Sequence, residues 1–332
     1  IAGAGNDHRL GANEAPPAII SIFLGDMLTD IIEQVEKGSR KRTLKGGDLD
    51  LGARMLPHIP RHSGDRNRTS PFAFTGNKFE FRAVGSTAAV SWPNTVINAI
   101  VAESLSDIAT QLEELVNRKT RPEKIESACE RVLKGIIKEH KKVVFNGDNY
   151  SEDWQDEAAK RGLPNIKDSV DALPRLGTKK AKDVFKKFKI LKPAEVDSRV
   201  TIFFEKLAHQ LQIESEQMVL IGRQLILPAA YRQQTMFAEA VAAAEGAGVD
   251  TGPQRERLDA FVDLLGRFHV KLDELDTADN HADDDPKRHA KYLRDTIRPL
   301  MEDLRVLGDE LETHVCADLW PLPSYRELLF LR

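Results

Sequence analysis

Three charged side chains alternate with two aromatic ones in a short, strongly patterned segment. Lys78, Glu80 and Arg82 are separated by Phe79 and Phe81. Successive side chains of a β-strand point to opposite faces, so the three charges would lie on one face, about 7 Å apart in succession. Arginine and lysine hold anionic oxygens, and a carboxylate helps to hold a divalent cation that bridges them. The pattern suits a polyphosphate ligand. The alternative is a solvated outer face, with the carboxylate screened between two cations.

A second group of chemically useful residues lies near the start of the sequence, at residues 7–14. Gly11 and Asn13 permit unusual backbone angles, so this loop has the freedom to close over a ligand. Arg9 has the geometry to bind a carboxylate through two hydrogen bonds. Glu14 would be a general base if it were shielded from water. Equally, Glu14 would be a favourable charge at a helix N-terminus, with a stabilisation of about 0.3–1 kcal/mol.

Paired strands and flanking helices must position these residues. Residues 66–84 predict a β-hairpin that turns at Thr75-Gly76-Asn77 and carries Arg66 and Arg68 on its first strand. Apolar residues at helical spacing predict a helix over residues 18–35. A third element, a helix that begins at Ser91-Trp92-Pro93-Asn94, is expected to follow the hairpin and end near Val116.

Nearly everything after residue 117 has helical periodicity. The expected helices cover residues 122–142, 152–161, 178–189, 194–227, 229–245, 252–277 and 286–315. Pro228 is expected to kink or split the long central pair, and the apolar tail, residues 320–331, is expected to pack on the chain. We therefore predict an α+β protein with two parts: residues 1–117, which carry the strands and the chemistry, and residues 118–332, a helical region without evident chemistry. His281 and His289 flank an acidic loop in which a solvated surface is favoured over a metal site.

Composition bounds the class of protein. The 332 residues are 41% apolar and 30% charged with a net charge of −4, as in soluble globular proteins. The sequence has no overall positive charge that would favour nucleic-acid binding, and no apolar run is long enough for a membrane span. Two widely separated cysteines are typical of a reducing compartment, so we expect a cytoplasmic protein. Because the sequence begins at Ile1, without methionine and close to dense motif sequence, it is expected to be a fragment.

The motifs resemble those of one enzyme family, the glutamine synthetases, in the wording of the type III class. The run from His8 to Ala18 is similar to the loop that carries a glutamate-binding arginine and a flap glutamate. The run from Asp65 to Arg82 resembles the paired ATP and metal strands. The segments Pro93 to Val96 and Trp320 to Tyr325 are also similar to that class.

The resemblance implies roles for the residues that match the family motifs. Arg9 and Arg82 would bind the substrate glutamate. Glu14 would be the flap carboxylate that closes the site and accepts a proton from ammonium. Arg68 would hold ATP phosphates and stabilise the transferring phosphoryl group, and together with Glu14 it would be catalytic.

The ATP and metal strands complete the implied site. Lys78 would contact ATP, replacing the arginine that other classes place there, and Glu80 would be a ligand of one divalent cation, Mg²⁺ or Mn²⁺. One departure is that residues 70–74 lack the further arginine of many glutamine synthetases, so Arg66 is a candidate for that role. The remaining carboxylate ligands and a glycine- and histidine-bearing nucleotide segment of the family are not in this sequence.

The implied activity is the ATP-dependent ligation of ammonia to L-glutamate, which gives L-glutamine through a γ-glutamyl phosphate. The implied fold is the C-terminal part of a catalytic domain of antiparallel strands backed by helices, followed by a long helical extension. The implied assembly is a ring-shaped homo-oligomer, a dodecamer of two hexamers, and the fragment alone is expected to be inactive. Two alternatives stay open: a γ-glutamyl-amine ligase of the same fold, and an inactive helical assembly or interaction protein.

Overall fold

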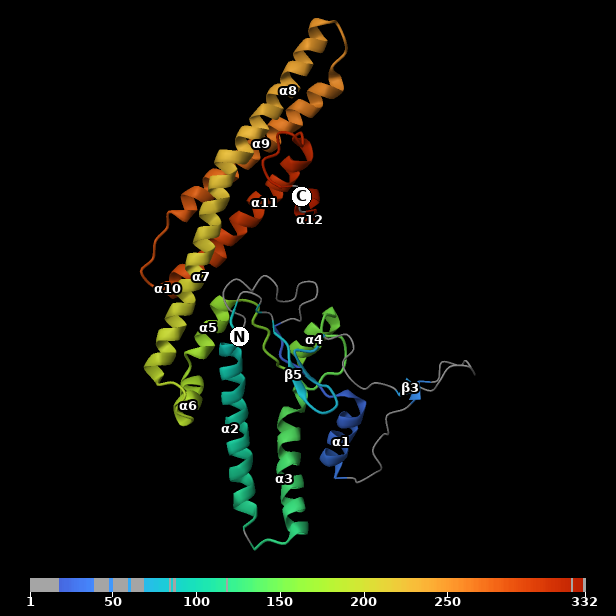
Figure 1. The fold of residues 1–332 in the computed structure, drawn as a ribbon, viewed down its shortest axis with the longest axis vertical. Coiled ribbons are helices and arrows are strands. Elements are labelled where there is room, and N and C mark those ends of the chain that lie inside the picture. The colour runs from blue at the N-terminus through green and yellow to red at the C-terminus, as the bar shows by residue number, and fades with distance from the viewer. Residues whose placement is uncertain are drawn as a thin grey trace. The chain divides into compact units, whose positions relative to one another are not determined.

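The computed structural model describes residues 18–38, 48–49, 59–60, 69–83, 85, 88–117, 119–323 and 325–330. The chain divides into two compact units, and the division falls after Val200, inside a long helix (Figure 1). The boundary at residue 117 that composition suggests does not coincide with this division. It stays a prediction about where the chemistry ends.

A small three-stranded sheet lies in the first unit, with the order β1-β4-β5. β1 (Ile22–Phe23) pairs in parallel with β4 (Phe72–Phe74), and β4 pairs antiparallel with β5 (Phe79–Phe81). Val144 adds an isolated parallel bridge to Ile22. A separate two-stranded antiparallel sheet joins β2 (Asp48–Leu49) to β3 (Ile59–Pro60). The predicted hairpin is therefore present, but the sheet around it is mixed rather than wholly antiparallel.

The helix expected over residues 18–35 begins seven residues later than predicted. α1 covers Gly25–Lys37, and the residues before it are extended. There Ile19 and Ser21 are buried while Ile20 between them is 51% exposed, which is the alternation of a strand. Gly25 has φ of +73°, a conformation that glycine adopts without strain, and it turns the chain from strand into helix.

The rest of the regular structure in the first unit is helical in the described residues. These further helices are α2 (Ser91–Leu115), α3 (Pro122–His140), α4 (Glu152–Lys160), α5 (Ser169–Leu176) and α6 (Lys179–Lys187), with a 3₁₀ turn at Lys141–Val143. All but α5 begin and end within a few residues of the predicted bounds. α5 was not predicted, although Asp168 caps it by accepting a hydrogen bond from the Asp171 N–H, a recognisable start signal. α2 and α3 lie side by side, and α1 packs on α3 (Figure 1).

The regular secondary structure of the second unit is helical in its described residues. α7 (Pro193–Ile221) begins in the first unit and continues into the second. It is followed by α8 (Leu227–Gly246), α9 (Gly252–Asp279), α10 (Pro286–Tyr292), α11 (Arg298–His314) and the short α12 (Tyr325–Leu329). The unit packs around α9, whose buried residues recur at helical spacing: Phe261, Leu264, Leu265, Phe268, Leu272 and Leu275. α8 and α11 both pack against α9.

Two prolines in this unit are accommodated by π-turns instead of breaks. Residues 222–226 and 293–297 are π-helical, and Pro228 and Pro299 follow them. In each turn the residue before the proline donates its N–H five residues back, Leu227 to the Gly222 carbonyl and Arg298 to the Leu293 carbonyl. Proline has no N–H for the regular bond four residues back, so a wider turn costs little there. Pro228 therefore does not split the helix.

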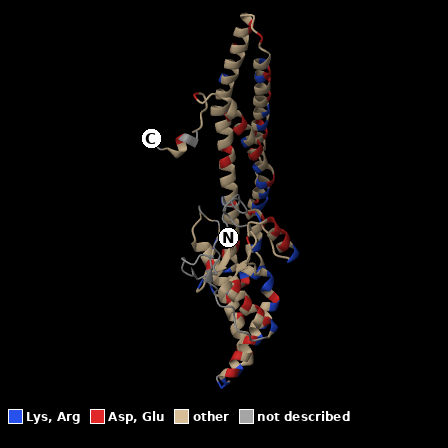
Figure 2. Cartoon of the chain, turned by 90° about the vertical axis from the view of Figure 1, so that its right-hand side faces the viewer, with Lys and Arg blue, Asp and Glu red and all other residues tan. Residues whose placement is uncertain are grey.

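Surface features complete the description. Leu328, Leu329 and Phe330 are 63–72% exposed, so the expectation that the apolar tail packs on the chain is wrong for these residues. Cys129 and Cys316 are both free thiols. Basic and acidic residues are interspersed along the helices in the view of Figure 2. Among the described residues, no helix combines the length and apolar character needed to cross a bilayer.

Candidate active site on the β4–β5 hairpin

The hairpin presents its aromatic residues on one face, as its alternation predicts. Phe72 stacks on Phe79 with ring centroids 5.4 Å apart, and Phe74 and Phe81 complete the cluster. The turn closes with a hydrogen bond of 2.9 Å from the Thr75 N–H to the Lys78 carbonyl. Aromatic pairs across neighbouring strands stabilise a hairpin and fix its register. The opposite face therefore carries the three charged residues.

Those charges form a compact ion-pair triad. Lys78 Nζ lies 3.1 Å from one carboxylate oxygen of Glu80, and Arg82 Nη2 lies 3.1 Å from the other. Arg82 Nη1 also donates a hydrogen bond of 3.4 Å to the Ser70 carbonyl. The side chains are 64%, 38% and 21% exposed for Lys78, Glu80 and Arg82. Exposure thus decreases along the strand, from the turn toward Arg82.

Both cations favour the ionised form of the carboxylate. The hydrogen bonds from Lys78, and then from Arg82, lower the pKa of Glu80 below its ordinary value. Glu80 is therefore an anion at neutral pH, which is the form that a hard divalent cation binds. Among the described residues no three His, Cys, Asp or Glu side chains gather into a metal site. Glu80 would supply one anionic ligand to such a cation, and the further carboxylate ligands that the family resemblance implies are not in this sequence.

The pairing of the strands brings several chain segments to one edge of the sheet. Because β1 and β4 are parallel, the residues that lead into them, 18–21 and 69–71, lie at the same edge. β5 is antiparallel to β4, so it ends at that edge. The Arg82 N–H donates to the Pro71 carbonyl at 2.7 Å, which fixes this placement. Arg82 thus lies where both leading segments join the sheet, whereas Lys78 lies at the opposite end of the hairpin.

A buried polar network ties these two leading segments together. Ser21 Oγ donates to Asn149 Oδ1 at 2.6 Å, and Asn149 Nδ2 donates to Ser70 Oγ at 3.1 Å. The Asn149 N–H donates to Thr69 Oγ1 at 3.3 Å. All four side chains are at most 3% exposed. Buried polar groups are costly without partners, so this satisfied network fixes the starts of β1 and β4 relative to each other.

Asn146 performs a similar role at the other end of β1. Its side-chain oxygen accepts the N–H groups of Leu24 and Gly25 at 2.9 and 3.1 Å, and its Nδ2 donates to Thr29 Oγ1 at 2.8 Å. Asn146 therefore holds the first residues of α1 in place at the end of β1. Neither Asn146 nor Asn149 was predicted to have a structural role. The local sequence Asn146-Gly147-Asp148-Asn149 indicates a turn, but it does not indicate which residues the two asparagines contact.

The predicted site residues fall into two groups. Lys78, Glu80 and Arg82 are brought together on one face of the hairpin, with Glu80 in β5 and the two cations directly before and after it. Arg9, Glu14 and Arg68 lie outside the described residues, so their roles stay predictions. His281 packs its ring 4.0 Å from that of Tyr292.

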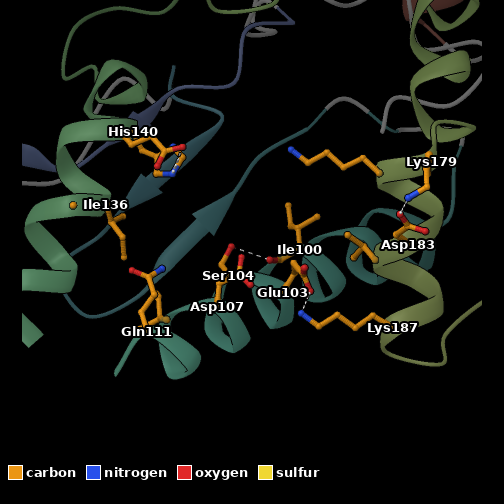
Figure 3. Close-up of a pocket in the computed structure, with 15 residues that line it drawn as sticks. Ile100, Glu103, Ser104, Asp107, Gln111, Ile136, His140, Lys179, Asp183 and Lys187 are labelled. Carbon is orange, nitrogen blue, oxygen red and sulfur yellow. Dashed lines mark hydrogen bonds and ion pairs between the residues drawn. The ribbon is translucent and has the colours of Figure 1, made fainter. Parts of the chain in front are cut away.

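A broad groove lies elsewhere in the first unit, between α2, α3 and α6 (Figure 3). Its walls carry charges of both signs that neutralise one another. Lys187 pairs with Glu103 at 2.7 Å, and Lys179 pairs with Asp183 at 2.9 Å. None of the predicted site residues lines it.

Comparison with known proteins agrees with the sequence motifs. The family model of the glutamine synthetase C-terminal domain matches residues 128–245. Over the whole chain, 38% of residues are identical to the type-3 glutamine synthetase of Dictyostelium discoideum, of which the match covers 46%. The glutamine synthetases of Bacteroides fragilis and Butyrivibrio fibrisolvens are 34% and 33% identical over 100% and 99% of the chain, and 47% of each is covered. The chain thus spans about half the length of these curated relatives.

The hairpin motifs, the family model and the similarity over the whole chain agree. The chain belongs to the glutamine synthetase family. Its predicted resemblance to the type III class is confirmed, since the Dictyostelium relative carries that designation. The family model lies within the region that was predicted to be a helical extension, and it includes both Asn146 and Asn149.

Proposed function

We propose that the full-length protein ligates ammonia to L-glutamate at the expense of ATP and that this chain supplies part of the active site. The observation that carries the proposal is the shared sheet edge. The described residues that follow the Arg9–Glu14 loop and those that follow Arg68 join the sheet side by side, next to Arg82. This arrangement supports the proposal that the Arg9–Glu14 loop, Arg68 and Arg82 contribute to a single active site.

The first stage of the proposed reaction is phosphoryl transfer. A side-chain carboxylate oxygen of glutamate attacks the γ-phosphorus of ATP, and the bond to the ADP oxygen breaks. Catalysis of such a step depends on positioning and charge neutralisation. Arg68 and Lys78 would hold the phosphate oxygens, and Arg82 would hold the glutamate. A divalent cation, Mg²⁺ or Mn²⁺, bound by Glu80 and further ligands would neutralise polyphosphate charge.

The second stage is amide formation. The nitrogen of ammonia attacks the acyl carbon of γ-glutamyl phosphate, and phosphate leaves. Glu14 would accept the proton that converts ammonium into ammonia, and Arg9 would keep the glutamate oriented. The acyl phosphate must be shielded from water, a task suited to a closing loop that ends in Glu14. By family resemblance we extend the proposal to a cytoplasmic, ring-shaped homo-oligomer, a dodecamer of two hexamers.

Substitutions of Glu80 and Arg82 test the proposal in the full-length protein. Glu80→Ala removes an anionic metal ligand, so we expect turnover to fall by roughly tenfold or more and the Mg²⁺ requirement to rise. Arg82→Ala removes a charged donor to the substrate, so we expect KM for glutamate to rise by roughly tenfold or more. Steady-state kinetics with varied Mg²⁺ and glutamate measures both effects.

Glu33→Ala is the matched control, because Glu33 pairs with Lys37 on the exposed surface of α1. Its kinetics should equal those of the wild type. Wild-type kinetics in both the Glu80 and Arg82 variants would refute the assignment. Activity with amines other than ammonia that exceeds activity with ammonia would favour the γ-glutamyl-amine ligase instead.

A further inference from the structure

A second cavity in the first unit is distinct from the hairpin site in both position and lining. It lies between α2, α5 and α6 and has a volume of about 410 Å³. Its apolar wall includes Trp92 and Phe185, whose rings stack 5.9 Å apart. Phe185 belongs to a buried cluster with Ala99 and Val196, so the packed core holds this wall in place. A cavity of this size with fixed apolar walls is suited to a small molecule.

The charge at its rim is of one sign. Of the fourteen lining residues two are cationic, Arg175 and Lys180, and none is acidic. Arg175 lies in the last turn of α5, and Lys180 lies in the first turn of α6. No ion pair within the described part of the chain engages either one. Two uncompensated cations beside an apolar cavity form an amphipathic surface.

The neighbouring groove of Figure 3 shows why this rim is distinctive. Although Lys180 borders both hollows, carboxylates also line the larger groove and pair with its lysines. A negatively charged ligand would meet Glu103 and Asp183 there, which disfavours it. The smaller cavity offers an anion two cations and no opposing acid.

We propose that this cavity binds a small amphipathic anion, a monocarboxylate whose apolar body packs against Trp92 and whose carboxylate lies between Arg175 and Lys180. Burial of the apolar body supplies the attraction, and the two cations select the negative charge. The cavity shares no residue with the hairpin site, so this inference does not depend on the proposed ligase activity.

Calorimetric titration of the full-length protein with octanoate, and with 1-octanol as its uncharged counterpart, tests the proposal. Exposed ion pairs are partly screened, so we expect octanoate to bind roughly three- to tenfold more tightly than octanol. Lys180→Glu and Arg175→Glu should each weaken octanoate by roughly threefold or more and leave octanol unchanged. Ala172→Phe should abolish binding of both compounds, because Ala172 lines this cavity and not the larger groove.

Lys186→Glu is the matched control, since it makes the same charge change on an exposed part of α6 that lines neither hollow. It should leave octanoate affinity as in the wild type. The proposal is overturned if octanoate does not bind at millimolar concentration, if octanol binds equally well, or if Lys186→Glu weakens binding as much as Lys180→Glu. Arg175 and Lys180 are exposed, so these variants keep the test decisive even where Ala172→Phe fails to fold.

Discussion

Asp283 illustrates how local geometry sets the ionisation of a single carboxylate. The guanidinium of Arg288 donates to it from Nε at 3.0 Å and from Nη2 at 2.9 Å. The Asp285 N–H adds a hydrogen bond of 2.9 Å. These hydrogen bonds lower the pKa of Asp283 from 3.8 to about 2, and those from Arg288 contribute most. The carboxylate thus holds the start of α10 through its charge.

This lowered pKa predicts an acid-dependent contribution to stability. A depressed carboxyl pKa stabilises the fold fully above the ordinary value of 3.8, and the contribution is lost as the pH falls toward about 2. Asp283→Asn should therefore lower the free energy of unfolding at neutral pH, and the difference from the wild type should shrink across that window. Urea unfolding at several pH values measures it. Arg288→Gln should raise the Asp283 pKa in an NMR titration, and an unmoved titration would contradict the assigned cause.

At the scale of residues, the sequence predicted contacts between near neighbours better than contacts between distant ones. The alternation of Phe79, Glu80 and Phe81 was sufficient to place aromatic and charged faces, because a strand has a fixed period of two. Asn149 was not predictable in this way. Its partners Ser21 and Ser70 are 128 and 79 residues away, and no local pattern records such a pairing. The exposure of Lys78 and Glu80, at 64% and 38%, also matches the solvated alternative, whereas Arg82 is only 21% exposed.

At the scale of elements, periodicity indicated the long helices, and local backbone requirements decided their ends. In α9, which is 28 residues long, the buried apolar residues recur at helical spacing from Phe261 to Leu275. In contrast, the apolar residues before Gly25 match both a helix and a strand, and their pairing with β4 decides for the strand. The π-turns before Pro228 and Pro299 were also not predicted, because proline was expected to kink or split the helix at Pro228.

Glycine substitutions in the second unit test the packing of one π-turn. A Cβ on Gly222 would lie 2.7 Å from Cδ1 of Leu272, which is fully buried. Gly222→Ala should therefore destabilise the protein by about 1–3 kcal/mol, although alanine is the better helix former. Chemical denaturation measures the change in the free energy of unfolding.

The control comes from a glycine that has free space around it. Gly266 lies inside α9, is exposed, and has no atom within 4 Å of a built Cβ. Gly266→Ala should stabilise the protein by about 0.5–1 kcal/mol, because only the backbone entropy changes. Equal effects of the two substitutions would show that the close approach to Leu272 is absent in solution.

At the scale of the whole molecule, the rival to a ligase is an inactive helical assembly protein. An active site that binds ATP, Mg²⁺ and a glutamate analogue stabilises the folded state by mass action, by about 2.7 kcal/mol at one hundred times the dissociation constant. We therefore expect the unfolding temperature of the full-length protein to rise by several degrees when all three are added. A thermal-shift assay measures this, and a temperature that stays constant at saturating concentrations favours the assembly protein.

The hydrogen bonds of Asn149 limit where the polypeptide can be truncated without loss of the strand arrangement. The segment that holds Ser21, Thr69 and Ser70 in register comes from beyond residue 117, from within the match to the C-terminal domain model. Chemistry and scaffold therefore do not separate at the point where strands give way to helices. A polypeptide trimmed to the motif-bearing residues would keep every side chain proposed to touch a substrate, yet it would lose the anchor that brings their strands to a common edge.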